Sequence, residues 1–258
     1  MQLTGKVAAI TGGSRGIGRG IAEAFLREGA SVAINGRNDA KGKQALEELD
    51  AGDRAIFVQG DVRNKDDVDR FVDEAAAHFG QIDILVNNAG GTSDSAPVAE
   101  LSDESWDNTI QWCVYSTFWA TRRALAHMLP RQYGRIINIS SVEGKHGKPG
   151  ISHYVTAKHA INGFTKACAK EVATAGITVN ALCPGLILTD VVRENGASAA
   201  ASMGLTFDEM VDMFAQESAI KRLNKVEEVA AVAVLLASDH AAGVTGSLYN
   251  VDGGTAAY

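Results

Sequence analysis

The chain has 258 residues, a length that favours one large α/β domain over two small ones. Its net charge of −7, with no basic run longer than Arg122-Arg123, argues against a nucleic-acid partner. Its three cysteines lack disulfide-like spacing, its longest apolar stretch is too short for a bilayer and its N-terminus lacks a signal-peptide pattern, so we expect a cytoplasmic protein without a membrane anchor.

Short apolar segments rich in β-branched residues alternate with helical patterns along almost the whole chain. The segments are continuous apolar runs, which is typical of parallel strands covered on both faces. Strands are predicted over residues 7–11, 31–34, 55–59, 84–86, 135–140, 178–181 and 247–251. Helices are predicted over residues 18–28, 40–49, 65–79, 103–128, 153–174 and 226–237.

This alternation requires right-handed crossovers between parallel strands. It predicts a single-domain Rossmann-type α/β fold over residues 1–258, with a doubly wound parallel sheet of about seven strands and helices on both faces. A stretch rich in Ala, Met and Phe, around residues 190–219, breaks the alternation. We interpret it as a helical lid over a substrate site.

A glycine-rich loop, residues 11–18, follows the first predicted strand and opens the first predicted helix. Its glycines permit a tight turn and let a pyrophosphate approach the helix N-terminus, where free N–H groups and the helix dipole favour an anion. The loop therefore predicts a dinucleotide site. The residues expected to bind the dinucleotide there are Gly12, Ser14, Arg15, Gly16, Ile17 and Gly18.

The end of the second predicted strand bears on the choice of nicotinamide cofactor. Enzymes that use NAD place a carboxylate there for the ribose 2′-hydroxyl, whereas this chain has Asn35-Gly36-Arg37 and no acid before Asp39. A guanidinium is charged, planar and forked, so Arg37 can stack on adenine and pair with a 2′-phosphate while Arg15 closes the other side. These residues favour NADP(H); NAD(H) is the alternative if both arginines are merely solvated.

The three-residue spacing between Gly12 and Gly16 resembles that of the short-chain dehydrogenase/reductase family, whose other motifs follow in order over essentially the whole chain. Those motifs are Asp61-Val62, Asn87-Asn88-Ala89-Gly90, Pro184-Gly185 with Thr189, and Val251-Asp252-Gly253-Gly254. The resemblance implies further cofactor contacts from Asp61, Val62, Asn88, Ala89, Gly90, Pro184, Gly185, Ile187 and Thr189. It also implies a homotetramer in which the helices predicted over 103–128 and 153–174 pair across a two-fold axis.

The predicted helix from residue 153 carries Tyr154 and Lys158, and a four-residue step puts both on one helical face. A tyrosine pKa of about 10 is too high for efficient proton transfer at neutral pH, and a nearby ammonium lowers it. Ser141 lies 13 positions before Tyr154, the separation that the family keeps. The resemblance implies that Tyr154 is the acid/base, that Lys158 binds the nicotinamide ribose and tunes the tyrosine, and that Ser141 orients the substrate oxygen.

One position departs from the family's pattern. Cys113 stands where family members carry an asparagine that supports a helix kink and holds a water linking the lysine to solvent. A thiol cannot fully replace an amide, so the proton relay is in doubt. We interpret Cys113 as a buried structural thiol rather than a nucleophile. The departure leaves open a cofactor-binding, poorly catalytic subunit. Trp112 and Trp119 either line the substrate region or pack the helix interface, and we expect packing for both.

Substrate contacts are expected mainly from Thr92, Glu143, His153 and Leu186. Ser93 and lid residues such as Phe214 are further candidates. A related 3-hydroxybutyrate dehydrogenase pattern has a histidine at the place of Glu143, to hold a carboxylate. Because like charges repel, Glu143 argues against small 3-hydroxy acids and for a neutral polyol, sugar-like or amine-bearing carbonyl substrate. The alternative is that Glu143 bonds to loop backbone or to Lys145.

Together these features predict an NADP(H)-dependent oxidoreductase that transfers hydride between nicotinamide and a small-molecule carbonyl or secondary alcohol, without a metal. An NAD-dependent alcohol dehydrogenase is the alternative. Residues 152–170 and 176–180 also resemble polyketide ketoreductases and 3-oxoacyl-carrier-protein reductases. An acyl-carrier substrate would favour a basic surface at the pocket mouth, for which the candidates are Lys145, Lys148, Arg122 and Arg123.

Overall fold

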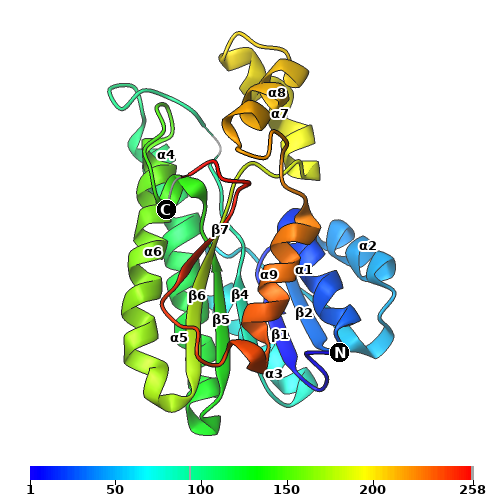
Figure 1. The fold of residues 1–258 in the computed structure, drawn as a ribbon. Helices are drawn as coiled ribbons and strands as arrows, with labels where there is room; N and C mark the ends of the chain where they lie inside the picture. Colours follow the sequence, from blue (N-terminus) through cyan, green and yellow to red (C-terminus); the bar gives the residue numbers. More distant parts are fainter. Residues whose placement is uncertain (93, 257–258) are drawn as a thin grey trace.

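The computed structural model describes residues 1–92 and 94–256, which form a seven-stranded sheet flanked by helices (Figure 1). The strands are all parallel, in the order β3-β2-β1-β4-β5-β6-β7. They are β1 (Val7–Ile10), β2 (Ser31–Gly36), β3 (Ala55–Gln59), β4 (Ile84–Asn87), β5 (Gly134–Ile139), β6 (Ile177–Pro184) and β7 (Leu248–Val251). The predicted doubly wound Rossmann fold is confirmed, with its switch point between β1 and β4.

Helices cover both faces of the sheet, and each face has its own hydrophobic cluster. On one face lie α1 (Gly16–Arg27), α2 (Asp39–Leu49) and α9 (Val226–Ala237). On the other lie α3 (Lys65–Phe79), α5 (Ser116–Met128) and α6 (Ser152–Val172). Because side chains alternate along a strand, Ile10 of β1 enters the first cluster and Ala9 the second. Among the described helices, none has both the length and the apolar character needed to cross a bilayer.

A buried polar network ties the central strands to α5 and α6. The Asn87 Nδ2 group of β4 donates to Asn138 Oδ1 of β5 at 2.8 Å and to Thr121 Oγ1 of α5 at 2.9 Å. Asn138 Nδ2 in turn donates to Thr165 Oγ1 of α6 at 2.9 Å. Since unpaired polar groups are costly in a protein interior, this network specifies how the two helices lie against the sheet.

The structure differs from the sequence prediction over residues 103–128, where we expected one continuous α-helix. A π-helical turn, Gln111–Tyr115, separates α4 (Asp103–Ile110) from α5. The turn places the Cys113 thiol against Gly91, whose N–H donates to Sγ at 3.3 Å, and the Thr117 hydroxyl donates to the Cys113 carbonyl at 2.8 Å. Such turns interrupt regular helical hydrogen bonding and recur at functional sites.

The segment predicted around residues 190–219 contains two helices, α7 (Asp190–Ser202) and α8 (Phe207–Glu217). Thr189 caps α7, accepting a hydrogen bond from the Val192 N–H at 3.4 Å, and Thr206 forms a capping box with Glu209 at the start of α8. Both helices stand beyond the C-terminal ends of the strands (Figure 1). We propose that they act as a lid over the site described next.

Candidate active site

A cavity of about 490 Å³ opens at the C-terminal ends of the central strands. It lies at the sheet's switch point, where α/β proteins of this type bind their ligands. Most of the predicted cofactor and catalytic residues line it, namely Gly12, Ser14, Arg15, Gly16, Ile17, Arg37, Val62, Asn88, Ala89, Gly90, Ser141, Tyr154, Lys158, Pro184, Gly185, Ile187 and Thr189. The predicted substrate residues Thr92 and Leu186 line it too.

The glycine loop presents the N-terminus of α1 to this cavity. Gly12 (φ +63°) and Gly16 (φ +57°) occupy the left-handed region, which side chains other than glycine rarely adopt. Asn88 Nδ2 holds the loop by donating to the Thr11 carbonyl at 3.0 Å and the Gly12 carbonyl at 3.1 Å. Among the described side chains, none caps the first turn of α1. The free N–H groups of α1 therefore suit an anionic ligand such as a pyrophosphate.

One polar atom in the cavity wall at the end of β2 has no hydrogen-bond partner in the part of the chain that the structure describes. Asn35 is buried, and its Nδ2 donates to the Val58 carbonyl at 3.1 Å and the Gly60 carbonyl at 3.2 Å. Its Oδ1 finds no hydrogen-bond donor among the described residues. Since Asn35 lines the cavity, a ligand that brings a donor, such as the amino group of adenine, fits this wall.

Cations gather around one end of the cavity, and an acid of helix α7 lies among them. Arg15 Nη1 is 3.1 Å from Glu194 Oε2, and Lys41 Nζ is 3.4 Å from Glu194 Oε1. The Arg37 guanidinium carbon lies 5.8 Å from the Trp112 ring centroid. Sequence reasoning missed Lys41, although a cation four residues after Arg37 is a recognisable signal.

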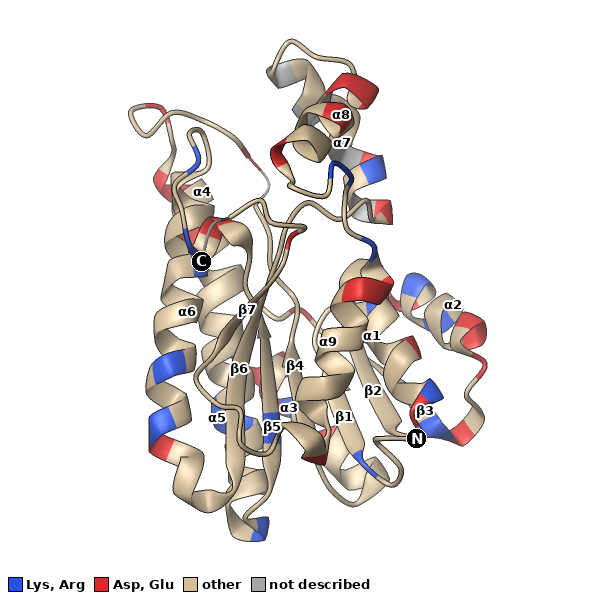
Figure 2. Ribbon diagram, viewed as in Figure 1, with Lys and Arg blue, Asp and Glu red and all other residues tan. Residues whose placement is uncertain are grey.

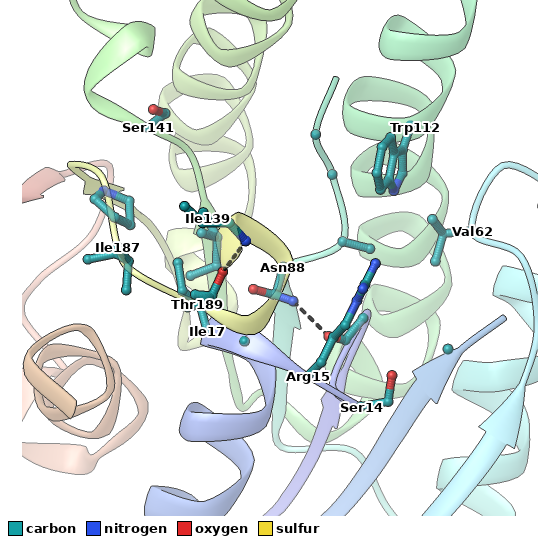
Figure 3. A pocket seen from close by; sticks show the side chains of 18 of the residues that line it. Ser14, Arg15, Ile17, Val62, Asn88, Trp112, Ile139, Ser141, Ile187 and Thr189 are labelled. Atoms are coloured by element: carbon teal, nitrogen blue, oxygen red, sulfur yellow. Dashed lines mark hydrogen bonds between the residues drawn. The ribbon is translucent and has the colours of Figure 1, made fainter. Parts of the chain in front are cut away.

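Trp112 both lines the cavity and packs against the hydrophobic cluster beneath α5 and α6, so the expected packing is confirmed and the alternative holds as well. Figure 3 shows Val62 and Trp112 on one side of the cavity and Ser141 and Ile187 on the other, with Arg15 and Asn88 between them. Trp119 packs against the same cluster, as expected, but is not among the residues that line the cavity. The π-helical turn, which the sequence did not predict, is what carries Trp112.

The candidate catalytic residues come from the end of β5 and the first turns of α6. Ser141 precedes a short helical turn, Val142–Gly144, and Tyr154 and Lys158 lie one helical turn apart. Lys158 is 3% exposed; its Nζ donates to the Ile139 carbonyl at 2.8 Å and lies 5.4 Å from the Tyr154 ring centroid. Lys158 therefore stands close to the tyrosine, as the spacing predicted.

A nearby Lys158 ammonium would by itself lower the pKa of the Tyr154 phenol, yet the surroundings as a whole raise that pKa. Burial raises the pKa of the Tyr154 phenol, and the negative charge of the Glu143 carboxylate raises it further. Burial also lowers the pKa of Lys158, because a low-dielectric interior disfavours the ammonium. In the protein alone, Tyr154 is therefore a neutral phenol, which is the form that can donate a proton to a substrate.

Two predicted cofactor residues do not line the cavity within the described chain. Gly18 lies behind the glycine loop, and any side chain there would collide with the Asn88 amide and the Gly12 carbonyl. Its role in the structure is therefore to let helix and loop pack closely. The Asp61 carboxylate pairs with Arg63 at 2.7 Å, outside the cavity wall.

Two predicted substrate residues are not among the residues that line the cavity: His153 is enclosed, whereas Glu143 is partly exposed and adjoins the cavity through Ser141. His153 is fully buried, and its Nε2 is 2.6 Å from the Thr92 hydroxyl. Glu143 accepts a hydrogen bond from the Ser141 hydroxyl, and its Oε1 lies 3.9 Å from Lys148 Nζ. The suggested Lys145 partner donates instead to the Leu248 carbonyl at 3.1 Å. Ser93 lies outside the described residues.

Cys113 is a fully buried free thiol. Burial raises its pKa, so the reactive thiolate is disfavoured at neutral pH. A Cβ at Gly90 would lie 3.1 Å from the Cys113 sulfur and 3.5 Å from Lys158 Nζ, so the thiol stands near the lysine's end of the cavity. These observations favour the structural interpretation of Cys113 over the nucleophilic one.

Comparisons with known proteins agree with this geometry. A family profile described as short chain dehydrogenase matches residues 6–200. The chain is 38% identical to a 3-oxoacyl-[acyl-carrier-protein] reductase of Chlamydia muridarum and 36% identical to a D-beta-hydroxybutyrate dehydrogenase of Cupriavidus necator, each over 98% of both chains. A crystal structure of a variant actinorhodin polyketide ketoreductase with NADPH superposes with a TM-score of 0.94 at 35% identity, covering 100% of this chain and 99% of that one.

Proposed function

The chain belongs to the short-chain dehydrogenase family, and from this premise we propose that it is an NADP(H)-dependent reductase of small polar ketones. Membership makes it an NAD(P)-dependent oxidoreductase of carbonyl and alcohol groups. The observation that carries the finer proposal is the convergence of Ser141, Tyr154 and Lys158 on one cavity with the anion-ready glycine loop and its cations.

Each of the three residues has a distinct task in this proposal. A bound nicotinamide supplies the hydride to the carbonyl carbon or accepts it from the alcohol carbon. Tyr154, held as a neutral phenol, donates its proton to the carbonyl oxygen, and Ser141 donates a hydrogen bond to the same oxygen. Lys158 donates one N–H to the Ile139 carbonyl, and its other N–H groups are available to the ribose hydroxyls.

We assign the cation cluster of Arg15, Arg37 and Lys41 to the 2′-phosphate of NADP(H). In support, the described part of the β2–α2 connection has no acid before Asp39 to receive a ribose 2′-hydroxyl. The similar ketoreductase, moreover, was solved with NADPH. A guanidinium–phosphate bond is charge-assisted and therefore contributes strongly to affinity.

We expect the wild-type protein to bind NADPH more tightly than NADH, and Arg37→Ser to weaken NADPH binding by about 10- to 100-fold with little effect on NADH. The measurement is a fluorescence titration of the bound nicotinamide. Arg27→Ser, an exposed arginine paired with Glu23 at the far end of α1, is the matched control. Preference of the wild type for NADH would favour the NAD-dependent alternative, and binding of neither cofactor would overturn the proposal.

The Glu194 carboxylate competes with a phosphate for Arg15 and Lys41. We therefore expect Glu194→Gln to tighten NADPH binding by about two- to fivefold, a modest gain because the three side chains are roughly half exposed and solvent screens them. NADH, which has no 2′-phosphate, should not gain in the same titration. Glu23→Gln, which removes another exposed acid of an arginine pair, should change neither affinity. Equal effects of Glu194→Gln on both cofactors would contradict the competition.

A small-molecule substrate suits the charges around the lid better than an acyl carrier protein does. Lys145 and Lys148, two of the candidate basic residues, are engaged with the Leu248 carbonyl and with Glu143. Figure 2 shows acidic residues on α8; they are Asp208, Glu209, Asp212 and Glu217. An acidic carrier would be repelled by this helix, so we keep carrier-bound substrates as the second candidate.

We place self-association, which the family resemblance implies, on helices α5 and α6. Phe118 of α5 is 40% exposed and meets Phe164 of α6 edge to face, with ring centroids 6.4 Å apart. Tyr115, on the π-helical turn, is 50% exposed. Exposed aromatic residues on neighbouring helices are typical of the anchors of a protein interface, which supports a homotetramer built through this surface.

A further inference from the structure

The Ser141 hydroxyl, which the proposed reaction needs as a hydrogen-bond donor to substrate, already donates a hydrogen bond within the protein. The Ser141 hydroxyl donates a hydrogen bond to the Glu143 carboxylate, and the Glu143 backbone N–H donates a hydrogen bond to Ser141 Oγ at 3.3 Å. A serine hydroxyl has one proton to give. Ser141 can therefore bond to Glu143 or to a substrate oxygen through that proton, but not to both.

Releasing the serine leaves a mostly buried carboxylate short of a donor. The Glu143 side chain is 15% exposed, so water replaces the lost hydrogen bond poorly. Lys148 remains as its partner at 3.9 Å, beyond direct hydrogen-bonding distance. A plain ketone, which brings no hydrogen-bond donor, thus binds at the expense of the hydrogen bond to Glu143. A substrate with a donor group beside its carbonyl restores a hydrogen bond to Glu143.

We propose that Glu143 is a specificity-determining residue that selects ketones with a hydroxyl group on the carbon next to the carbonyl. The inference rests on the proposed function and names its substrate class: α-hydroxyketones in reduction and vicinal diols in oxidation. Ser141 turns to the carbonyl oxygen while Glu143 accepts the hydrogen bond of the adjacent hydroxyl. Two oxygens on neighbouring carbons match two side chains that are themselves in contact.

The charges around Glu143 favour a neutral donor over a cationic one. Lys148 already supplies a positive charge to the carboxylate, and its Nζ also lies 3.9 Å from the centroid of the Phe214 ring on α8. The Glu143–Lys148 pair therefore adjoins the lid helix. An amine-bearing substrate would have to compete with Lys148, and a carboxylate substrate would be repelled by Glu143. A hydroxyl group meets neither obstacle.

In the reaction, hydride from the bound nicotinamide adds to the carbonyl carbon and the Tyr154 proton adds to its oxygen. The α-hydroxyketone and NADPH become a vicinal diol and NADP⁺, and Tyr154 regains its proton from water. The adjacent hydroxyl is not consumed. Glu143 thus acts by recognition rather than by taking part in a bond that breaks.

The test compares acetoin with butanone, and hydroxyacetone with acetone, pairs that differ by one hydroxyl. We expect wild-type kcat/KM with NADPH to favour the hydroxyketone by about 10- to 100-fold. Glu143→Ala should bring this ratio close to one while raising turnover of the plain ketone, because Ser141 is freed. Glu143→Gln, whose amide oxygen still accepts a hydrogen bond, should give an intermediate ratio. Glu171→Gln, a surface change on α6, should leave both values unchanged.

A readout that does not depend on turnover is the thermal midpoint with butanediol or butanol added. The diol should raise the midpoint of the wild type more than the alcohol does, and this difference should vanish in Glu143→Ala. Equal wild-type kcat/KM values for butanone and acetoin would overturn the inference and leave the reductase proposal standing. Binding of NADPH without turnover of any of the four ketones would instead count against the proposed function itself.

Discussion

Tyr154→Phe should lower kcat/KM for ketone reduction by about 10²- to 10⁴-fold, the range typical of a lost general acid. The phenol lines the cavity, its surroundings keep it protonated, and no other phenol lines the cavity within the described residues. NADPH affinity should change little, because the variant keeps the glycine loop and Lys158. Consumption of NADPH at saturating ketone measures the loss, and a nicotinamide fluorescence titration checks the affinity.

The pH dependence follows from the direction of the tyrosine's shift. Burial and Glu143 raise the Tyr154 pKa, so reduction, which uses the phenol, should stay level through neutral pH and fall only in the alkaline range. Alcohol oxidation, which uses the phenolate, should rise as pH increases. Tyr133→Phe, at a phenol that donates to Asp239 just before the start of β5 and does not line the cavity, is the control. An unchanged rate in Tyr154→Phe would remove the tyrosine from the reaction, and an inert wild type that binds NADPH would favour the poorly catalytic subunit.

Asn138→Ala should lower the free energy of unfolding by about 2–4 kcal/mol. Asn138 is fully buried, accepts from Asn87 and donates to Thr165, so its loss leaves two buried polar groups short of a partner and opens a cavity. Since Thr165 lies on the helix that carries Tyr154 and Lys158, a fall in kcat should accompany the lost stability. Urea denaturation followed by circular dichroism measures the effect.

A double-mutant cycle with Thr165→Val isolates the hydrogen bond between Asn138 and Thr165. Their coupling should be about 1 kcal/mol or more, because the two side chains meet in the core. Thr174→Val, an exposed threonine beyond the end of the same helix, should change stability by less than about 0.5 kcal/mol. If Asn138→Ala proved as mild as the Thr174 control, the network would not be what orients α5 and α6.

Much of the fold could be read from local patterns. The continuous apolar runs predicted each strand to within a few residues. A parallel strand that is buried on both faces is apolar at nearly every position, so it can be recognised from its own residues. Gly29, Gly80 and Gly176 follow helical segments, and all three adopt the left-handed conformation expected there. The glycine loop and the Tyr154–Lys158 step were likewise visible, since each lies within a few residues of sequence.

The tertiary structure decided the features that depend on distant segments. The π-helical turn that carries Trp112 and Cys113 is one, because its register follows from packing against Gly91 and α6 rather than from its own residues. The pairing of Arg15 with Glu194 is another, joining residues 179 positions apart. The sequence left loop backbone, Lys145 or a substrate as partners of Glu143, and the structure adds a partner that the sequence did not indicate, the Ser141 hydroxyl.

The physical reason is the distance over which each kind of interaction acts, along the chain or through space. Propensity, capping and hydrophobic periodicity act over one or two turns of backbone, so the sequence alone determined the strands, the helices and the chemistry available at their ends. Hydrogen bonds, ion pairs and burial act over a few ångströms of space, whatever the separation along the chain. Which acid faces the catalytic serine, and which cations share a carboxylate, was therefore decided only when the sheet and its helices brought those segments together.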